Sequence, residues 1–201
     1  LVLLLIWHLM QTGLGFGEAV RQASFNGVSI MTGTGYVSAN FSAWGGFATT
    51  ILLIVMFIGG CGGSTTCGIK VFRLQVLAST AKVQISRLLR PHAVVLAYYN
   101  KRPVSVEVMD SVMGFFYLFI LGFVLIAIML GMAGLDFVTA LSGAATSISN
   151  VGPGLGEVIG ADGNFSTLPD SAKWIMSFAM LLGRLEIFTV LVMLNPAFWQ
   201  R

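Results

Sequence analysis

The same order of segments occurs twice along the chain. Each half contains an apolar run, an amphipathic stretch, a turn with Gly and a second apolar run. In the first half these segments are residues 1–10, 16–32, 33–36 and 44–58. In the second half they are residues 112–133, 136–149, 150–154 and 172–194. An internal repeat of this kind predicts two structural units built on one plan.

The apolar runs predict membrane spans. Hydrophobic residues make up 56% of the chain and charged residues only 9%, whereas a soluble domain carries about 25% charged residues. The amphipathic stretches are too short or too polar to cross a bilayer, which needs roughly 20 apolar residues. We interpret them as re-entrant half-helices. The predicted fold is an all-α multi-pass membrane protein with two repeats of span, re-entrant pore helix and span. Leu1 already lies in an apolar run, so we expect a chain truncated at its amino end.

Basic residues indicate the orientation of these spans. The segment 70–102 contains no Asp or Glu and holds most of the Lys and Arg residues of the chain, namely Lys70, Arg73, Lys82, Arg87, Arg90, Lys101 and Arg102. The positive-inside rule places such a segment in the cytoplasm. The same charges also suit a patch for anionic lipid or nucleic acid, but topology requires no additional partner, and we expect no nucleic-acid partner. Both repeats then begin and end in the cytoplasm, including the C-terminus.

Acidic residues lie in the segments that this topology places near the outer face. They are Glu18, Asp136, Glu157, Asp162 and Asp170. One interpretation is a negative mouth that attracts cations. The alternative is a set of ordinary surface carboxylates clear of lipid.

The turns after the two half-helices have the composition of a selectivity filter. Irregular backbone at membrane depth must be buried in protein or line an aqueous path, and Gly permits the dihedral angles that aim carbonyls at an ion. The first turn contains Gly33, Thr34, Gly35 and Tyr36, and the second contains Asn150, Val151, Gly152 and Pro153. Thr34-Gly35-Tyr36 matches V-G-Y of the potassium-channel sequence T-V-G-Y-G. Val151-Gly152-Pro153 aligns with it, with Pro in place of the aromatic residue.

With these two turns the chain resembles the Trk/Ktr/HKT superfamily of potassium transporters, and most closely its bacterial TrkH-type subunits. The resemblance implies potassium uptake across the bacterial inner membrane through four such repeats around one pore. The present residues would be the third and fourth repeats, or half of a pseudo-fourfold pore. Potassium would then bind backbone carbonyls of Thr34, Gly35, Val151 and Gly152. Neither Gly35 nor Gly152 is the Ser that accompanies sodium permeation in plant relatives.

A Gly-rich stretch follows the second apolar run at a depth where a helix is expected. Residues 44–58 span about 22 Å as a helix, short of the roughly 30 Å hydrocarbon core. The stretch contains Gly59, Gly60, Cys61, Gly62, Gly63 and Ser64. One interpretation is a flexible helix end that permits close packing. The other, which the resemblance implies, is an intramembrane gating loop below the filter. We expect Cys61 and Cys67 to be reduced thiols.

Arg184 is predicted near the middle of the last apolar run. A charge at that depth is costly and faces a cavity or a partner. The resemblance implies a basic barrier below the filter on the last span, and Arg184 is the candidate. The alternative is a structural Arg paired with a carboxylate or a helix end elsewhere in the protein.

Three domains are predicted: a pore repeat (1–69), a basic connecting segment (70–111) and a second pore repeat (112–201). The connecting segment is expected to form a helix over 71–89 that is broken at Pro91. The resemblance implies a homodimer and a cytosolic nucleotide-binding regulatory subunit of the TrkA type. Membrane lipid and two further repeats complete the expected partners. No cofactor is expected, and potassium is the transported ligand.

The sequence does not favour an enzyme. It has no P-loop, dinucleotide-binding fingerprint or Ser/His/Asp grouping. The alternative function is a secondary transporter with broken helices around a midplane substrate site.

Overall fold

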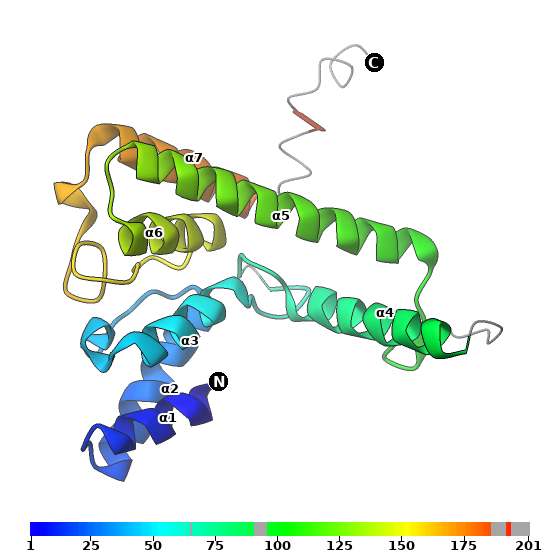
Figure 1. Ribbon diagram of the computed structural model, residues 1–201, viewed down its shortest axis with the longest axis horizontal. Coiled ribbons are helices and arrows are strands. Elements are labelled where there is room, and N and C mark those ends of the chain that lie inside the picture. Colours follow the sequence, from blue (N-terminus) through cyan, green and yellow to red (C-terminus); the bar gives the residue numbers. More distant parts are fainter. Residues whose placement is uncertain (65, 91–95, 186–191, 194–201) are drawn as a thin grey trace.

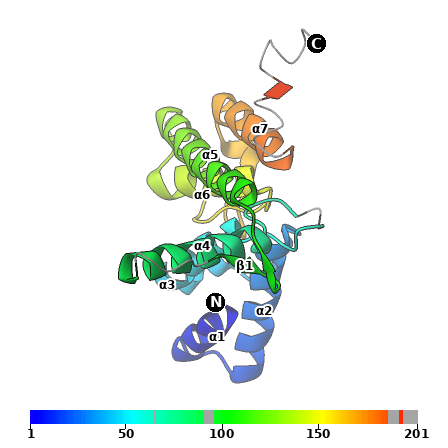
Figure 2. The same ribbon diagram turned by 90° about the vertical axis from the view of Figure 1, so that its right-hand side faces the viewer.

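The computed structural model describes residues 1–64, 66–90, 96–185 and 192–193. Its helices form two groups that lie against each other (Figure 1, Figure 2). The first group contains α1 (Val2–Gln11), α2 (Phe16–Thr32), the 3-10 helix η1 (Phe41–Trp44) and α3 (Gly46–Phe57). The second contains α5 (Val106–Met132), α6 (Phe137–Ser149), the 3-10 helix η2 (Phe165–Thr167) and α7 (Asp170–Arg184). Helix α4 (Val71–Leu89) and a hairpin of β1 (Tyr98–Tyr99) and β2 (Arg102–Pro103) connect them.

The two amphipathic stretches form helices as predicted. Helix α2 has the predicted bounds, and α6 begins one residue after Asp136. The Asp136 carboxylate caps α6 by accepting a hydrogen bond from the Thr139 N–H at 3.2 Å. Hydrogen bonds from Thr139 hold the pKa of Asp136 below its usual value. The largest effect comes from the Thr139 side chain and a smaller one from its backbone N–H. The cap therefore keeps a negative charge at the N-terminus of α6, where the helix dipole stabilises it.

Among the described residues, α5 alone is both long enough and apolar enough to cross a membrane. Its 27 residues reach about 40 Å at 1.5 Å per residue. The helix starts earlier than the predicted span 112–133, so the predicted boundary between the connecting segment and the second repeat falls inside α5. Helices α1, α3 and α6 are shorter apolar helices.

Two other predicted spans differ from their expected bounds. The run 44–58 splits at Gly45, whose φ of 88° ends η1, and α3 is only 12 residues long. In the described part of the predicted run 172–194, α7 starts at Asp170 and its last helical residue is Arg184, with Leu185 in a turn. Arg184 is therefore the last helical residue of α7 in the part of the chain that the structure describes, and its predicted place in the middle of a span through residue 194 stays a prediction. Gly183, a poor helix former, lies directly before this end.

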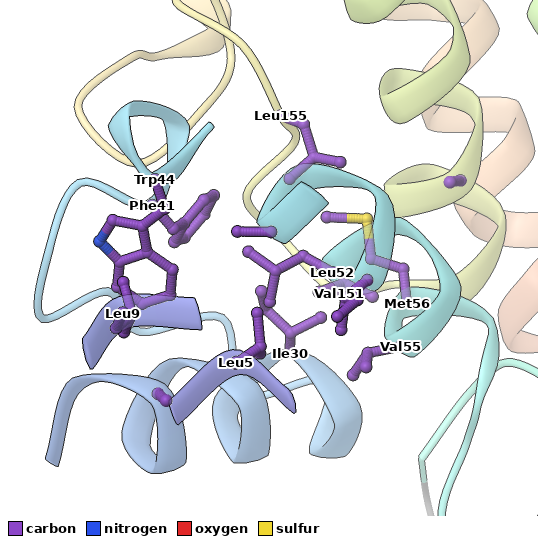
Figure 3. Packing of buried hydrophobic residues seen from close by; sticks show 14 of the residues in the cluster. Leu5, Leu9, Ile30, Phe41, Trp44, Leu52, Val55, Met56, Val151 and Leu155 are labelled. Atoms are coloured by element: carbon purple, nitrogen blue, oxygen red, sulfur yellow. The ribbon is translucent and has the colours of Figure 1, made fainter. Parts of the chain in front are cut away.

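The buried core links the two groups of helices. One cluster joins α1, α2 and α3 and also contains Val151 and Leu155 from the second half. Figure 3 shows the Val151 side chain beside Leu52 and close to Met56 of α3. A second cluster lies between α5, α6 and α7. Phe57 belongs to the border of both clusters, with edge-on ring contacts to Phe119 and Phe123 of α5. The second turn is thus anchored in the core of the first half.

Helix α4 has the predicted bounds and extends toward the same end of the molecule as the start of α5 (Figure 1). The guanidinium of Arg73 lies 3.9 Å from the ring centroid of Phe115 on α5, a cation–π contact that holds the two helices together. The predicted break at Pro91 lies outside the described residues, as does the part of the predicted last span beyond Leu185, apart from residues 192–193.

Candidate functional site

The two turns that follow α2 and α6 have the same backbone structure. Each helix ends in a Schellman motif, in which the residue after the left-handed position donates to a carbonyl five residues back. In the first turn, the Thr34 N–H donates to the Ser29 carbonyl at 3.0 Å. In the second, the Val151 N–H donates to the Thr146 carbonyl at 3.0 Å. Ser29 and Thr146 therefore occupy matching positions of the two helices.

Positive φ angles also recur at matching positions. The residues at the helix ends, Gly33 and Asn150, have φ of 69° and 52°. Two residues later, Gly35 and Gly152 have φ of 76° and 114°. Because L-residues rarely adopt these angles, the sequence pattern of glycines reflects a backbone requirement. Asn tolerates the left-handed region better than most side chains, which explains its place at position 150.

The two turns are in direct contact. A Cβ atom added to Gly35 would lie only 2.5 Å from the Val151 carbonyl oxygen and 3.2 Å from Pro153 Cδ. One added to Gly33 would lie 3.3 Å from the Asn150 oxygen, and one added to Gly152 would lie 3.5 Å from the Gly35 Cα. Segments more than a hundred residues apart thus meet backbone to backbone. Of the four residues whose carbonyls are the predicted ion ligands, the structure brings Gly35, Val151 and Gly152 together, and Thr34 directly precedes Gly35.

Both turns lie at the C-terminal ends of their helices. Helix dipoles add partial negative charge at such ends, which favours a nearby cation. Among the described residues there is no group of three His, Cys, Asp or Glu side chains that would hold a metal ion. The turns present backbone carbonyl oxygens, which are suitable ligands for a monovalent cation.

Buried polar side chains fix the chain that follows each turn. The Asn26 amide donates to the Ser38 hydroxyl at 3.0 Å, and its oxygen accepts from the Ser38 N–H at 3.1 Å. At the matching loop position, Leu155 is held at both its N–H and its carbonyl by the Ser142 hydroxyl, at 3.1 and 3.2 Å. Asn26 and Ser142 are almost fully buried. These hydrogen bonds fix the position of each loop relative to the helix that precedes the turn.

Sequence reasoning did not single out Asn26, Ser29, Ser142 or Thr146. The available signal was a polar side chain on the otherwise buried face of each amphipathic helix, because buried polar groups require hydrogen-bond partners. The hydrogen-bond partner of each of these side chains depended on the fold of the loop that follows the helix.

The Gly-rich stretch forms a closed loop whose ends are joined. The Gly59 N–H donates to the Ile69 carbonyl at 2.9 Å, and the Ile69 N–H donates to the Phe57 carbonyl at 2.8 Å. A Cβ on Gly59 would lie 2.4 Å from the Cys67 oxygen, so only Gly fits in this neck. Gly60 lies beside the hydroxyls of Ser64 and Thr66, whereas Cys61 is exposed and Gly63 has open space around it.

This loop approaches the first turn from one side. A Cβ on Gly33 would meet the Thr66 methyl at 4.0 Å. The loop also contacts the end of α7, where the Arg184 guanidinium lies 3.5 Å from the Cys67 sulfur. The structure therefore brings the predicted filter, gate and barrier residues into one region.

A cavity of about 230 Å³ lies where the loop meets α4, α5 and α7. Its lining includes Thr66 and Cys67 of the loop and three basic side chains, Lys70, Arg73 and Arg184. The positive charge of this lining disfavours a cation that rests there.

The end of α7 is fitted closely to the end of α6. A Cβ on Gly183 would lie 1.8 Å from the Ile148 oxygen, which requires Gly. The Asn150 amide donates to the Met180 carbonyl at 3.0 Å. The second turn is thus tied to the helix that carries Arg184.

The loops that follow the two turns also touch. The Asn40 amide donates to the Asp162 carboxylate, and the Ser42 hydroxyl donates to the Gly156 carbonyl at 2.9 Å. Of the predicted acidic mouth residues, Asp162 therefore lies at a junction between the halves. Glu18 forms an exposed ion pair with Arg21, and Asp170 forms one with Lys173.

Comparisons with known proteins agree on one family. The family model described as TrkH, cation transport protein, matches residues 10–201. The chain is 46% identical over 198 residues to the Trk system potassium uptake protein TrkI of Halomonas elongata, covering 98% of this chain and 40% of that protein. It is 37% identical over 181 residues to the Trk system potassium uptake protein TrkH of Escherichia coli, covering 90% of this chain and 37% of that protein.

The fold agrees as well. A crystal structure of the potassium transporter TrkH from Vibrio parahaemolyticus superposes with a TM-score of 0.90 at 38% identity, covering 99% of this chain and 42% of that one. The chain therefore spans about two fifths of the length of these relatives. The match of fold, sequence and family model establishes that this chain belongs to the TrkH family of cation transport proteins.

Proposed function

We propose that these residues form half of a potassium-conducting pore, in which carbonyls of Thr34, Gly35, Val151 and Gly152 bind the ion. One observation carries the proposal: two turns of the same backbone structure meet so closely that a Cβ on Gly35 would lie 2.5 Å from the Val151 oxygen. Backbone carbonyls presented at helix C-termini are suitable ligands for potassium. The related proteins named above are potassium uptake proteins, which supports the choice of ion.

Two such turns cannot surround an ion, so the other half of the filter comes from the rest of the protein chain or from a second copy. The proposed units are a pore repeat at 1–69, a connecting segment at 70–111 and a second repeat at 112–201. The protein lies in the bacterial inner membrane with residues 70–102 and the C-terminus in the cytoplasm. It works as a homodimer with a cytosolic nucleotide-binding subunit of the TrkA type.

The loop over Gly59, Gly60, Cys61, Gly62, Gly63 and Ser64 acts as the gate, and Arg184 adds an electrostatic barrier. The Thr66 methyl group, which would lie 4.0 Å from a Cβ added to Gly33, supports a loop that lies close to the filter. The contact of Cys67 with Arg184 supports a barrier that is adjacent to the loop. Opening then requires the loop to leave the space below the turns.

The test is ion flux through the full-length protein in reconstituted vesicles. A pore of this kind carries potassium down its gradient, prefers potassium to sodium and needs no organic substrate. Saturable uptake of an organic substrate, without passive potassium flux, would favour the secondary transporter with a midplane site.

Replacing Arg184 with Ala is expected to increase potassium flux by about tenfold, the effect of lowering a barrier by roughly 1.4 kcal/mol, because a positive charge that repels the cation is removed. Arg184→Lys keeps the charge and should retain most of the barrier. Lys173→Ala is the matched control, because Lys173 lies on the same helix in an exposed ion pair with Asp170.

Thermal stability of the same variant separates the two roles of Arg184. Breaking a buried ion pair costs about 3 to 5 kcal/mol, and the variant would then unfold at a lower temperature without a gain in flux. That result would assign Arg184 to structure instead of the barrier.

A further inference from the structure

Thr146 makes two hydrogen bonds to the second turn from a fully buried position in α6. Its backbone carbonyl accepts from the Val151 N–H at 3.0 Å. Its hydroxyl oxygen accepts from the Gly152 N–H at 3.0 Å. A single residue of the helix therefore holds two successive peptide groups of the turn.

The second of these bonds fixes the direction of a carbonyl. A peptide group is planar and trans, so its N–H and C=O point in opposite directions. The Gly152 N–H points back to α6, and the carbonyl of the same peptide group, that of Val151, must point away from it. The Val151 oxygen does lie on the side of Gly35, as the 2.5 Å approach to an added Cβ shows.

The matching peptide group of the first turn is held differently. The Gly35 N–H donates to the backbone carbonyl of Ser29 at 3.3 Å. The Ser29 hydroxyl instead donates to the Tyr36 carbonyl at 2.7 Å. The direction of the Thr34 carbonyl thus depends on backbone alone, whereas the direction of the Val151 carbonyl depends on a side chain that a substitution can remove.

We propose that Thr146 is a positioning residue that sets ion selectivity by aiming the Val151 carbonyl, an inference that rests on the proposed filter function. Without the hydroxyl, the peptide group between Val151 and Gly152 has no acceptor on α6 and can rotate about the flexible Gly152. A rotated carbonyl leaves the ion, and the cage loses its selectivity for potassium more than its ability to pass ions.

The experiment compares three variants of the full-length protein in reconstituted vesicles. Thr146→Val has nearly the same shape without the hydroxyl, and Thr146→Ser keeps the hydroxyl without the methyl group. Ser147→Ala is the matched control, since among the described residues its buried hydroxyl donates to carbonyls of its own helix, those of Gly143 and Ala144. The readouts are the potassium-to-sodium flux ratio, the flux itself and the thermal unfolding temperature.

We expect the potassium-to-sodium flux ratio to fall about fivefold in Thr146→Val, the factor that one hydrogen bond typically contributes. Thr146→Ser and Ser147→Ala should keep the wild-type ratio. If Thr146→Val does not assemble, Thr146→Ala provides a smaller side chain that lacks the hydroxyl.

A wild-type ratio in a stable variant without the hydroxyl, while Gly152→Ala loses selectivity, would overturn the role of Thr146 and leave the filter in place. An equal loss in Thr146→Ser would also overturn it, because that variant keeps the hydroxyl. Wild-type ratios in the Thr146 and Gly152 variants alike would contradict the filter itself.

Discussion

Gly35→Ala should reduce the potassium-to-sodium flux ratio of the full-length protein by about tenfold or more. The added methyl group would lie 2.5 Å from the Val151 oxygen, where carbon and oxygen rest at roughly 3.3 to 3.6 Å. One turn must therefore move by roughly 1 Å. Overpacking of this kind costs about 1 to 3 kcal/mol, and here the displaced atom is a proposed ion ligand.

The expected loss in Gly35→Ala has two causes, backbone strain at a positive φ and the clash with the Val151 oxygen. Gly13→Ala separates these causes. Gly13 also has a positive φ, 97°, but an added Cβ there meets nothing within 4 Å. Both variants share the strain of a left-handed Ala, about 1 to 2 kcal/mol, and only Gly35→Ala disturbs the contact between the turns. We expect Gly13→Ala to lose some stability and to keep its selectivity.

Gly152→Ala should also reduce the potassium-to-sodium flux ratio, but through a different cause. Its φ of 114° is strained for Ala, while the added Cβ would make an ordinary contact with the Gly35 Cα at 3.5 Å. Unchanged selectivity in both the Gly35 and the Gly152 variants would show that these turns do not line the ion path.

Deleting Gly62, Gly63 and Ser64 should increase potassium flux by about tenfold, the effect of lowering a barrier by roughly 1.4 kcal/mol. The deletion removes the Ser64 hydroxyl that donates to the Thr66 hydroxyl, and the shortened loop would draw Thr66 away from Gly33 of the first turn. The hydrogen bonds of its neck, between Gly59 and Ile69 and between Ile69 and Phe57, lie outside the deletion. The ends of α3 and α4 should therefore remain joined, and the protein should assemble.

Gly59→Ala displaces the loop without shortening it, because its Cβ would lie 2.4 Å from the Cys67 oxygen. This variant should also conduct faster than the wild type. Single-channel or vesicle flux gives the rate, and the thermal unfolding temperature reports assembly. If a stable deletion variant conducts like the wild type, the Gly-rich stretch serves helix packing, which was the alternative interpretation of the sequence.

The sequence determined those features of this chain that depend on neighbouring residues. The helix over residues 16–32 and the helix over 71–89 have the predicted bounds, because apolar periodicity and a terminal Gly or basic run are local signals. The glycines at 35 and 152 marked the turns, since positive φ restricts the residue type at that position. The repeated order of segments came from the same local patterns.

Tertiary structure alone decided which distant groups meet. The 2.5 Å approach between Gly35 and the Val151 oxygen depends on packing of the two halves through a shared core. The Thr146 hydroxyl accepts a hydrogen bond from the Gly152 N–H because the chain after α6 turns back toward this side chain. The Arg184 guanidinium lies next to Cys67 of the loop, a neighbour that a charge in an apolar run does not specify. Hydropathy records that a residue is apolar or charged, and it contains no information on which surface that residue will face once helices pack.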